Sequence, residues 1–89
     1  MVNIKWHDLL IYHKETCEKN VNILSFYLNN NNSYYIQQAY IDIMHNMVSS
    51  HAQALQNWCF ENNVVHDNIA FSWVTNLRNK INKYNERRI

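Results

Sequence analysis

Three side chains that can bind a metal ion fall on the expected inner stripes of two helical segments. His13 and Cys17 lie four residues apart, which places them on the same face of a helix. If the next segment folds back antiparallel at about residue 31, positions at one level have numbers that sum to roughly 61–64. His51 then falls near the level of His13, so His13, Cys17 and His51 form a candidate three-ligand zinc site with one open position.

The main prediction for these side chains is nevertheless packing, because no fourth ligand is evident and helix interiors often hold a hydrogen-bonded histidine. In the same register, Cys17 and Cys59 are separated by on the order of 13 residues of helical rise, about 19 Å. A disulfide needs Cα atoms within about 7 Å. We therefore expect two separate buried cysteines, as in a reducing compartment, and no resident cofactor or metal.

Catalytic motifs are missing from the sequence. The chain contains no glycine, so it has no glycine-rich phosphate loop and no nucleophile elbow. Its seven acidic residues fall mostly on the expected solvent faces and form no inward carboxylate pair for acid–base chemistry. A small helical bundle also leaves little room for a ligand pocket. We expect that the protein is not an enzyme.

The composition predicts that these residues lie on long helices. The chain has 89 residues, is 47% hydrophobic and 17% charged, and lacks both glycine and proline. Glycine and proline supply most turns, so their absence excludes a turn-rich β fold and favours few connections. Asparagine also tolerates the left-handed region, and we expect the many asparagines to form the turns and caps. Residues 1–89 form a single helical domain.

Apolar residues at steps of three and four predict helices at about 4–28, 33–61 and 67–85. In the first helix the stripe is Trp6, Leu10, His13, Cys17, Val21, Leu24 and Leu28. The second has two stripes, Ile36, Tyr40, Ile43, Met47, His51, Ala54 and Trp58 beside Ile41, Met44, Val48, Ala52, Leu55 and Cys59. The third has Ala70, Trp73, Leu77, Ile81 and Tyr84, flanked by Ile69 and Val74.

Capping residues precede each predicted helix. Asn3 suits the first N-cap, Asn32 or Ser33 the second, and Asp67 the third, where His66 and Phe71 occupy the positions of a hydrophobic staple. Short connections imply antiparallel neighbours. The prediction is an all-α, antiparallel up-down-up three-helix bundle with one long central helix. The structural alternative is a helical hairpin or bundle that completes its core by forming a homodimer.

In that bundle, the loop after the first helix and the end of the third lie at the same pole. The candidate partner-binding residues there are Tyr27, Asn30, Asn31, Tyr34 and Tyr35. Tyrosine and asparagine make adaptable, energetic contacts at protein interfaces. The alternative is that these rings simply close the end of the core.

The C-terminal end supplies a second candidate surface. Its basic residues are Arg78, Lys80, Lys83, Arg87 and Arg88, and Glu86 is the one acid among the last dozen residues. They could contact the phosphates of a nucleic acid. The alternative is a solvated helix end whose cations interact favourably with the helix dipole.

The sequence therefore predicts a small binding protein that occupies a protein partner. An inhibitor, an antitoxin or immunity factor, or an anti-defence factor of a phage or mobile element would suit this size. The alternative function is a nucleic-acid-binding accessory protein. No apolar run approaches the roughly 20 residues of a membrane span, so we expect no membrane contact. The expected location is the cytoplasm, or the host cytosol for a viral protein.

Overall fold

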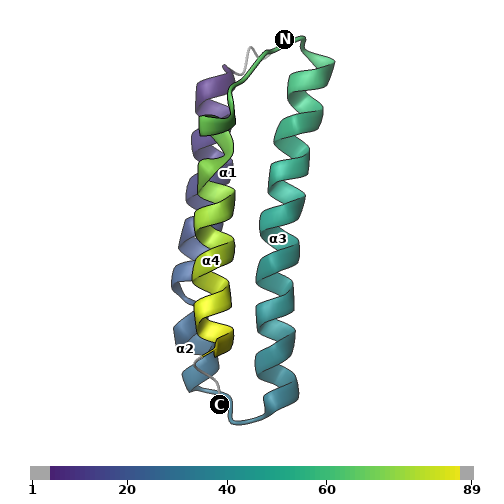
Figure 1. Ribbon diagram of the computed structural model, residues 1–89. Coiled ribbons are helices and arrows are strands. Elements are labelled where there is room, and N and C mark those ends of the chain that lie inside the picture. Colours follow the sequence, from purple (N-terminus) through teal and green to yellow (C-terminus); the bar gives the residue numbers. More distant parts are fainter. Residues whose placement is uncertain (1–4, 87–89) are drawn as a thin grey trace.

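The computed structural model describes residues 5–86 and contains only helices in that range. They are α1 (Trp6–Asn22), α2 (Leu24–Asn29), α3 (Tyr34–Glu61), the 3₁₀ helix η1 (Asn68–Phe71) and α4 (Ser72–Glu86). The long helix α3 runs antiparallel both to α1 with α2 and to α4 (Figure 1). The predicted all-α, up-down-up three-helix bundle is confirmed.

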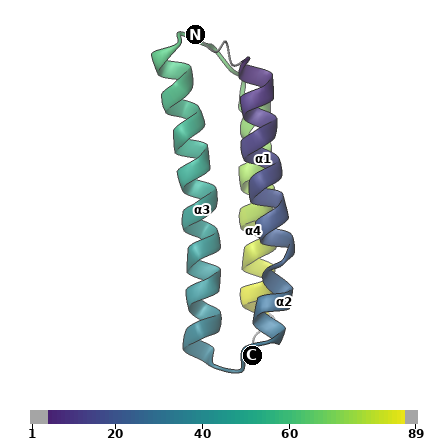
Figure 2. The ribbon, with the colours of Figure 1, turned by 180° about the vertical axis from the view of Figure 1, so that it is seen from behind.

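The first helix is broken, although the sequence predicted one continuous helix. Helix α1 ends at Asn22, and α2 starts after Ile23 and continues in a similar direction (Figure 2). Before the break, the Thr16 hydroxyl donates to the Tyr12 carbonyl at 2.7 Å, and the Asn20 amide donates to the Thr16 carbonyl at 2.8 Å. Side chains that bond to carbonyls four residues earlier compete with the helical ladder and bend it.

Two of the predicted helix starts are present. The Ser33 hydroxyl caps α3 by accepting from the Ile36 N–H at 3.4 Å. The Asp67 carboxylate accepts from the Ala70 N–H at 3.2 Å, but the turn it starts is η1, and α-helix follows only from Ser72. The predicted staple forms, with the His66 and Phe71 rings 4.6 Å apart. Asn3 lies outside the described residues, and α1 begins at Trp6 after Lys5, whose side chain makes no cap bond.

The end of α3 uses the one left-handed residue found between positions 5 and 86, Asn63, with φ of 55°. The Val64 N–H donates to the Cys59 carbonyl at 2.9 Å, and the Asn63 N–H donates to the Phe60 carbonyl at 3.5 Å. This is the Schellman pattern, in which glycine usually occupies the left-handed position. Asparagine takes over that role here, as a chain without glycine requires.

The core follows one of the two stripes predicted on α3. It contains, among others, Ile41, Met44, Val48 and Leu55 from α3, together with Cys17, Val21, Leu24, Leu28, Trp73, Val74, Leu77 and Ile81. On the neighbouring stripe, Ile36, Ile43 and Ala54 are exposed, as is Ile69 before α4, so their predicted core positions were wrong. Helix α4 packs on the other side of α3, which leaves the Ile43 side uncovered.

No helix within the described part of the chain combines the length and the apolar character needed to cross a membrane.

Candidate functional site

The predicted register brings the two inner histidines together. The Nδ1 atoms of His13 on α1 and His51 on α3 are 2.5 Å apart, and the ring centroids are 4.8 Å apart. One imidazole therefore donates its Nδ1–H in a hydrogen bond to the Nδ1 atom of the other. Burial lowers the pKa of His13, and the neighbouring His51 adds to this effect. The pair is a polar contact between two helices at the edge of the core.

The three-ligand metal site does not form. Among residues 5–86, no three histidine, cysteine or acidic side chains are grouped so that they could hold a metal ion. Cys17 is fully buried in the core, and burial, helped by Glu18, raises the pKa of its thiol to about 11. Zinc binds the thiolate, so this thiol is a poor ligand. His13, Cys17 and His51 lie on shared core stripes without forming a coordination sphere.

Both cysteines are free and buried, as the register predicted. Burial also raises the pKa of the Cys59 thiol. Each thiol behaves as a small apolar core group rather than as a nucleophile.

The turn between α2 and α3 presents the predicted aromatic pole, which lies beside the end of α4 (Figure 1). We define the tyrosine pole as Phe26, Tyr27, Asn30, Asn31, Tyr34 and Tyr35. Tyr35 is 86% exposed and Tyr34 64%, and their rings meet edge to face with centroids 6.2 Å apart. Phe26, which the sequence reasoning did not single out as a binding residue, is 62% exposed.

Tyr27 and the two asparagines of the tyrosine pole have structural contacts. The Tyr27 ring stacks on Tyr40 of α3 at 5.0 Å and is only partly exposed, so it helps to close the core. The Asn30 amide donates to the Phe26 carbonyl at 2.8 Å, and the Asn31 amide to the Tyr27 carbonyl at 2.9 Å. The Phe26 carbonyl also accepts from the Asn30 backbone N–H, whereas the Asn31 amide satisfies a carbonyl that the helix end would leave unpaired.

Gln37 completes the turn from the α3 side. Its amide donates to the carbonyls of Leu28 at 2.9 Å and Asn31 at 2.6 Å. The asparagine run therefore works through side-chain and backbone hydrogen bonds rather than left-handed backbone. The turn is a fixed platform on which Phe26, Tyr34 and Tyr35 are held outward.

The basic residues of α4 are divided between two faces of the helix. The Arg78 guanidinium donates to the Ser49 hydroxyl of α3 at 2.8 Å, whereas the Lys80 ammonium donates to the Asn22 side chain of α1. Lys83 lies near Lys80, because residues three apart share a helix face. Arg87 and Arg88 lie outside the described residues. The three predicted cations that the structure describes, Arg78, Lys80 and Lys83, thus do not form a single stripe.

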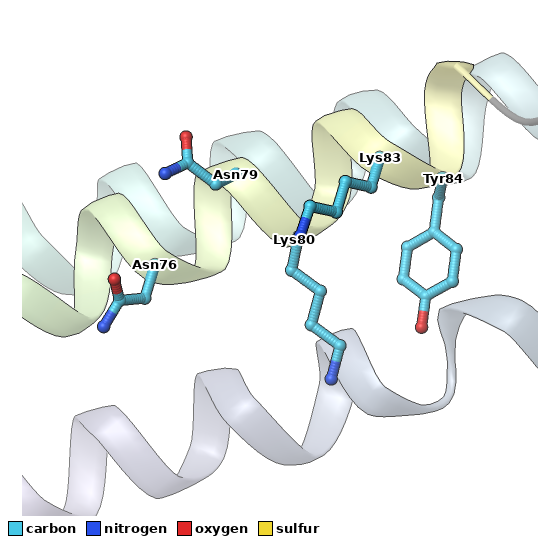
Figure 3. Close-up of a pocket in the computed structure, with 5 residues that line it drawn as sticks. All are labelled: Asn76, Asn79, Lys80, Lys83 and Tyr84. Atoms are coloured by element: carbon cyan, nitrogen blue, oxygen red, sulfur yellow. The ribbon is translucent and has the colours of Figure 1, made fainter.

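A pocket of about 500 Å³ lies on the Lys80 side of α4. It is lined by Asn76, Asn79, Lys80, Lys83 and Tyr84 (Figure 3). Lys80 and Tyr84 extend across it toward the first helical segment. The pocket therefore places two ammonium groups and one aromatic ring together. This smaller group, rather than the full predicted set, is the candidate anion-binding surface.

The three seams between the long helices differ in chemistry. The α1–α4 seam is polar and charged, and the side chains of Lys14, Glu18, Asn22, Asn76 and Lys80 line it. The α3–α4 seam is also polar, with Ser49, Gln53, Gln56, Thr75 and Arg78. A hollow of about 180 Å³ on the α1–α3 seam is lined only by His13, Ser50, His51 and Ala54.

The sequence did not indicate the α1–α3 seam as a candidate binding surface. The available signal was the composition of α3, in which Asp42 and Glu61 alone carry a formal charge when the histidines are neutral. A long solvent-exposed helix normally carries many charges on its outer side.

The second missed feature is the ring cluster at the opposite pole, where the ring centroid of Trp6 lies 5.9 Å from those of both Trp58 and His66. The register that paired His13 with His51 also pairs Trp6 with Trp58.

No protein-family model, curated protein or solved structure matches this chain.

Proposed function

We propose that this protein is a non-catalytic binding protein that acts by occupying a protein partner through the tyrosine pole. The observation that carries the proposal is the exposure of Phe26, Tyr34 and Tyr35, at 62%, 64% and 86%, on one firmly bonded turn. Exposed apolar groups that lie close together mark interaction sites, whereas a single exposed apolar side chain needs no partner. Aromatic side chains also dominate the binding energy of protein interfaces.

The rigidity of the turn strengthens the proposal. Binding costs less conformational entropy when the contact residues are already held in place. Here Gln37, Asn30 and Asn31 fix the backbone on both sides of the aromatic residues. In this proposal the asparagines position the binding residues, and Tyr34 and Tyr35 contact the partner directly.

In this proposal the protein is an inhibitor, an antitoxin or immunity factor, or an anti-defence factor of a phage or mobile element. It acts in the cytoplasm, or in the host cytosol. Each of these acts by covering a site on another protein and needs no active site of its own.

Site-specific photo-cross-linking tests the proposal. A photoreactive phenylalanine replaces either Tyr35 or Phe60, which are 86% and 87% exposed but lie at opposite poles. In cells of the source organism, position 35 should give a discrete cross-linked protein, and position 60 should not. Equal labelling from both positions, or none from position 35, would show that the tyrosine pole is not the binding surface.

A second candidate function is binding of a nucleic acid at the pocket around Lys80 and Lys83, with Tyr84 as a stacking surface. The juxtaposition of two cations and a partly exposed ring supports it. If both ammonium groups contact phosphates, log affinity should fall against log salt with a slope near −1.4 to −1.8.

The double substitution Lys80→Gln and Lys83→Gln tests that candidate. Binding of a single-stranded oligonucleotide should be lost together with the salt dependence. Arg78→Gln is the matched control, because Arg78 lies on the other face of α4 and bonds to Ser49. If Arg78→Gln weakens binding as much as the double substitution, the pocket is not the site.

A further inference from the structure

The outer edge of the α1–α3 seam is a candidate interface that the proposed function does not use. The His13–His51 contact marks its centre, and Tyr12 packs its ring against His13 at 5.3 Å while remaining 62% exposed. On α3, Ile43 is 54% exposed and lies two helical turns before Ser50, on the same face. No α4 residue lines the hollow at this seam.

We propose that this seam is the surface through which two copies of the chain form a homodimer. Charge permits self-association at the centre of this seam. The four residues that line the hollow carry no formal charge when the histidines are neutral, whereas the pockets on both other seams contain lysine, arginine or glutamate. An uncharged patch can meet its own copy without like-charge repulsion. The net charge of the chain, +1, adds little long-range repulsion between copies.

The seam also has the area of a stable interface. Helices α1 and α2 run beside α3 from Trp6 to Asn29, a length of about 36 Å. Two neighbouring helices with axes 8–10 Å apart present a strip roughly 18 Å wide. The strip covers on the order of 650 Å² per copy, within the roughly 600–1,000 Å² per partner of a standard stable interface.

The shape of the seam is self-complementary. A twofold dimer places the same surface on both sides, so that surface must carry both protruding and recessed groups. Here Tyr12 and Ile43 protrude, and the small side chains of Ser50 and Ala54 line the hollow. The seam therefore contains both halves of a self-complementary contact.

Sedimentation equilibrium on the full chain tests the homodimer. The wild type should be dimeric at tens of micromolar. Ile43→Glu should weaken the dimer at least about tenfold, because it buries an unpaired carboxylate in the interface. Ile69→Glu is the matched control, since Ile69 is 78% exposed and lies in η1, away from the seam, and it should remain dimeric.

Circular dichroism establishes that each variant is folded, and Ser50→Glu, at an exposed position of the hollow, replaces Ile43→Glu if the latter does not fold. A monomeric wild type would overturn the proposal and leave the seam to a helix of a different protein. A dimer that survives both seam substitutions would also overturn it. Neither result bears on cross-linking from position 35, so the proposed function and the homodimer fail independently.

Discussion

At the scale of single residues, a few polar side chains determine how the chain reverses direction and how its helices meet. The asparagine run suggests left-handed turn residues, yet Asn30 and Asn31 act through their amides on helix carbonyls. Gln37, a polar residue of α3, bonds to the backbone on the other side of the turn at Leu28 and Asn31. The tyrosine pole depends on these bonds for its geometry.

Gln37→Ala should lower the free energy of unfolding by about 1–2 kcal/mol, because it leaves the carbonyls of Leu28 and Asn31 without that donor. Urea denaturation followed by circular dichroism measures the change. Gln53→Ala is the control, since Gln53 bonds only to the exposed Asn57 side chain and should cost less than about 0.5 kcal/mol. An equal decrease in the free energy of unfolding of the two variants would show that the Gln37 hydrogen bonds do not stabilise the turn.

The His13–His51 contact makes stability depend on pH. The pKa of His13 is lower in the folded protein than its ordinary value of 6.5, because burial and His51 disfavour the cation. The unfolded chain therefore binds the proton more readily. This contribution to stability is present above about pH 6.5 and is lost as the pH falls toward the folded pKa.

Urea denaturation at about pH 7.5 and pH 5 should show a smaller acid loss of stability in His13→Leu than in the wild type. His7→Gln, at an exposed position of α1, should keep the wild-type difference. An unchanged acid loss in His13→Leu would show that the histidine pair does not carry the effect.

At the scale of helices, the periodic stripes and caps predicted three antiparallel helical segments and the bounds of α3, but not the division of the first segment or the 3₁₀ start of the third. The break at Ile23 was not predictable from periodicity, because the apolar spacing continues through it. It coincides with the competing bonds of Thr16 and Asn20, which depend on side-chain conformation. Similarly, two adjacent stripes on α3 were equally apolar. Only the placement of α4 decides that Ile41 is buried and Ile43 exposed.

The end of α3 depends on the left-handed conformation of Asn63. Asn63→Gly should leave stability unchanged or raise it slightly, since glycine adopts positive φ without a steric penalty. Asn63→Val should cost about 1–2 kcal/mol, because a β-branched residue is disfavoured there. Thermal denaturation of the pair measures this. Equal stability of the two variants would contradict the Schellman geometry.

At the scale of the whole molecule, the bundle has one buried core and two poles with different chemistry. One pole is closed by stacked rings around Trp6, and the other presents Phe26, Tyr34 and Tyr35 to solvent. The sequence located this second pole and its tyrosines correctly. It did not separate the exposed Tyr35 from the stacked Tyr27, because that difference depends on the Tyr40 ring across the helix pair.

The core thiols report on the integrity of the whole bundle. Cys17 and Cys59 are 0% and 4% exposed, and burial raises the pKa of both. A thiol-specific disulfide reagent should therefore modify them at the rate of unfolding, and urea should accelerate the reaction strongly. Complete modification of the native protein within the mixing time would mean that the helices do not enclose these side chains.

If the exposed tyrosines of the tyrosine pole contact a protein partner, alanine substitution at position 35 should weaken that contact. Tyr35→Ala and Phe60→Ala remove rings of nearly equal exposure, so both variants should stay folded. Affinity for the protein identified by cross-linking is measured by titration calorimetry. Tyr35→Ala should weaken binding about 30-fold, the effect expected for an interface hot spot, and Phe60→Ala should leave it unchanged. Unchanged binding by Tyr35→Ala, or an equal loss in both variants, would contradict the claim.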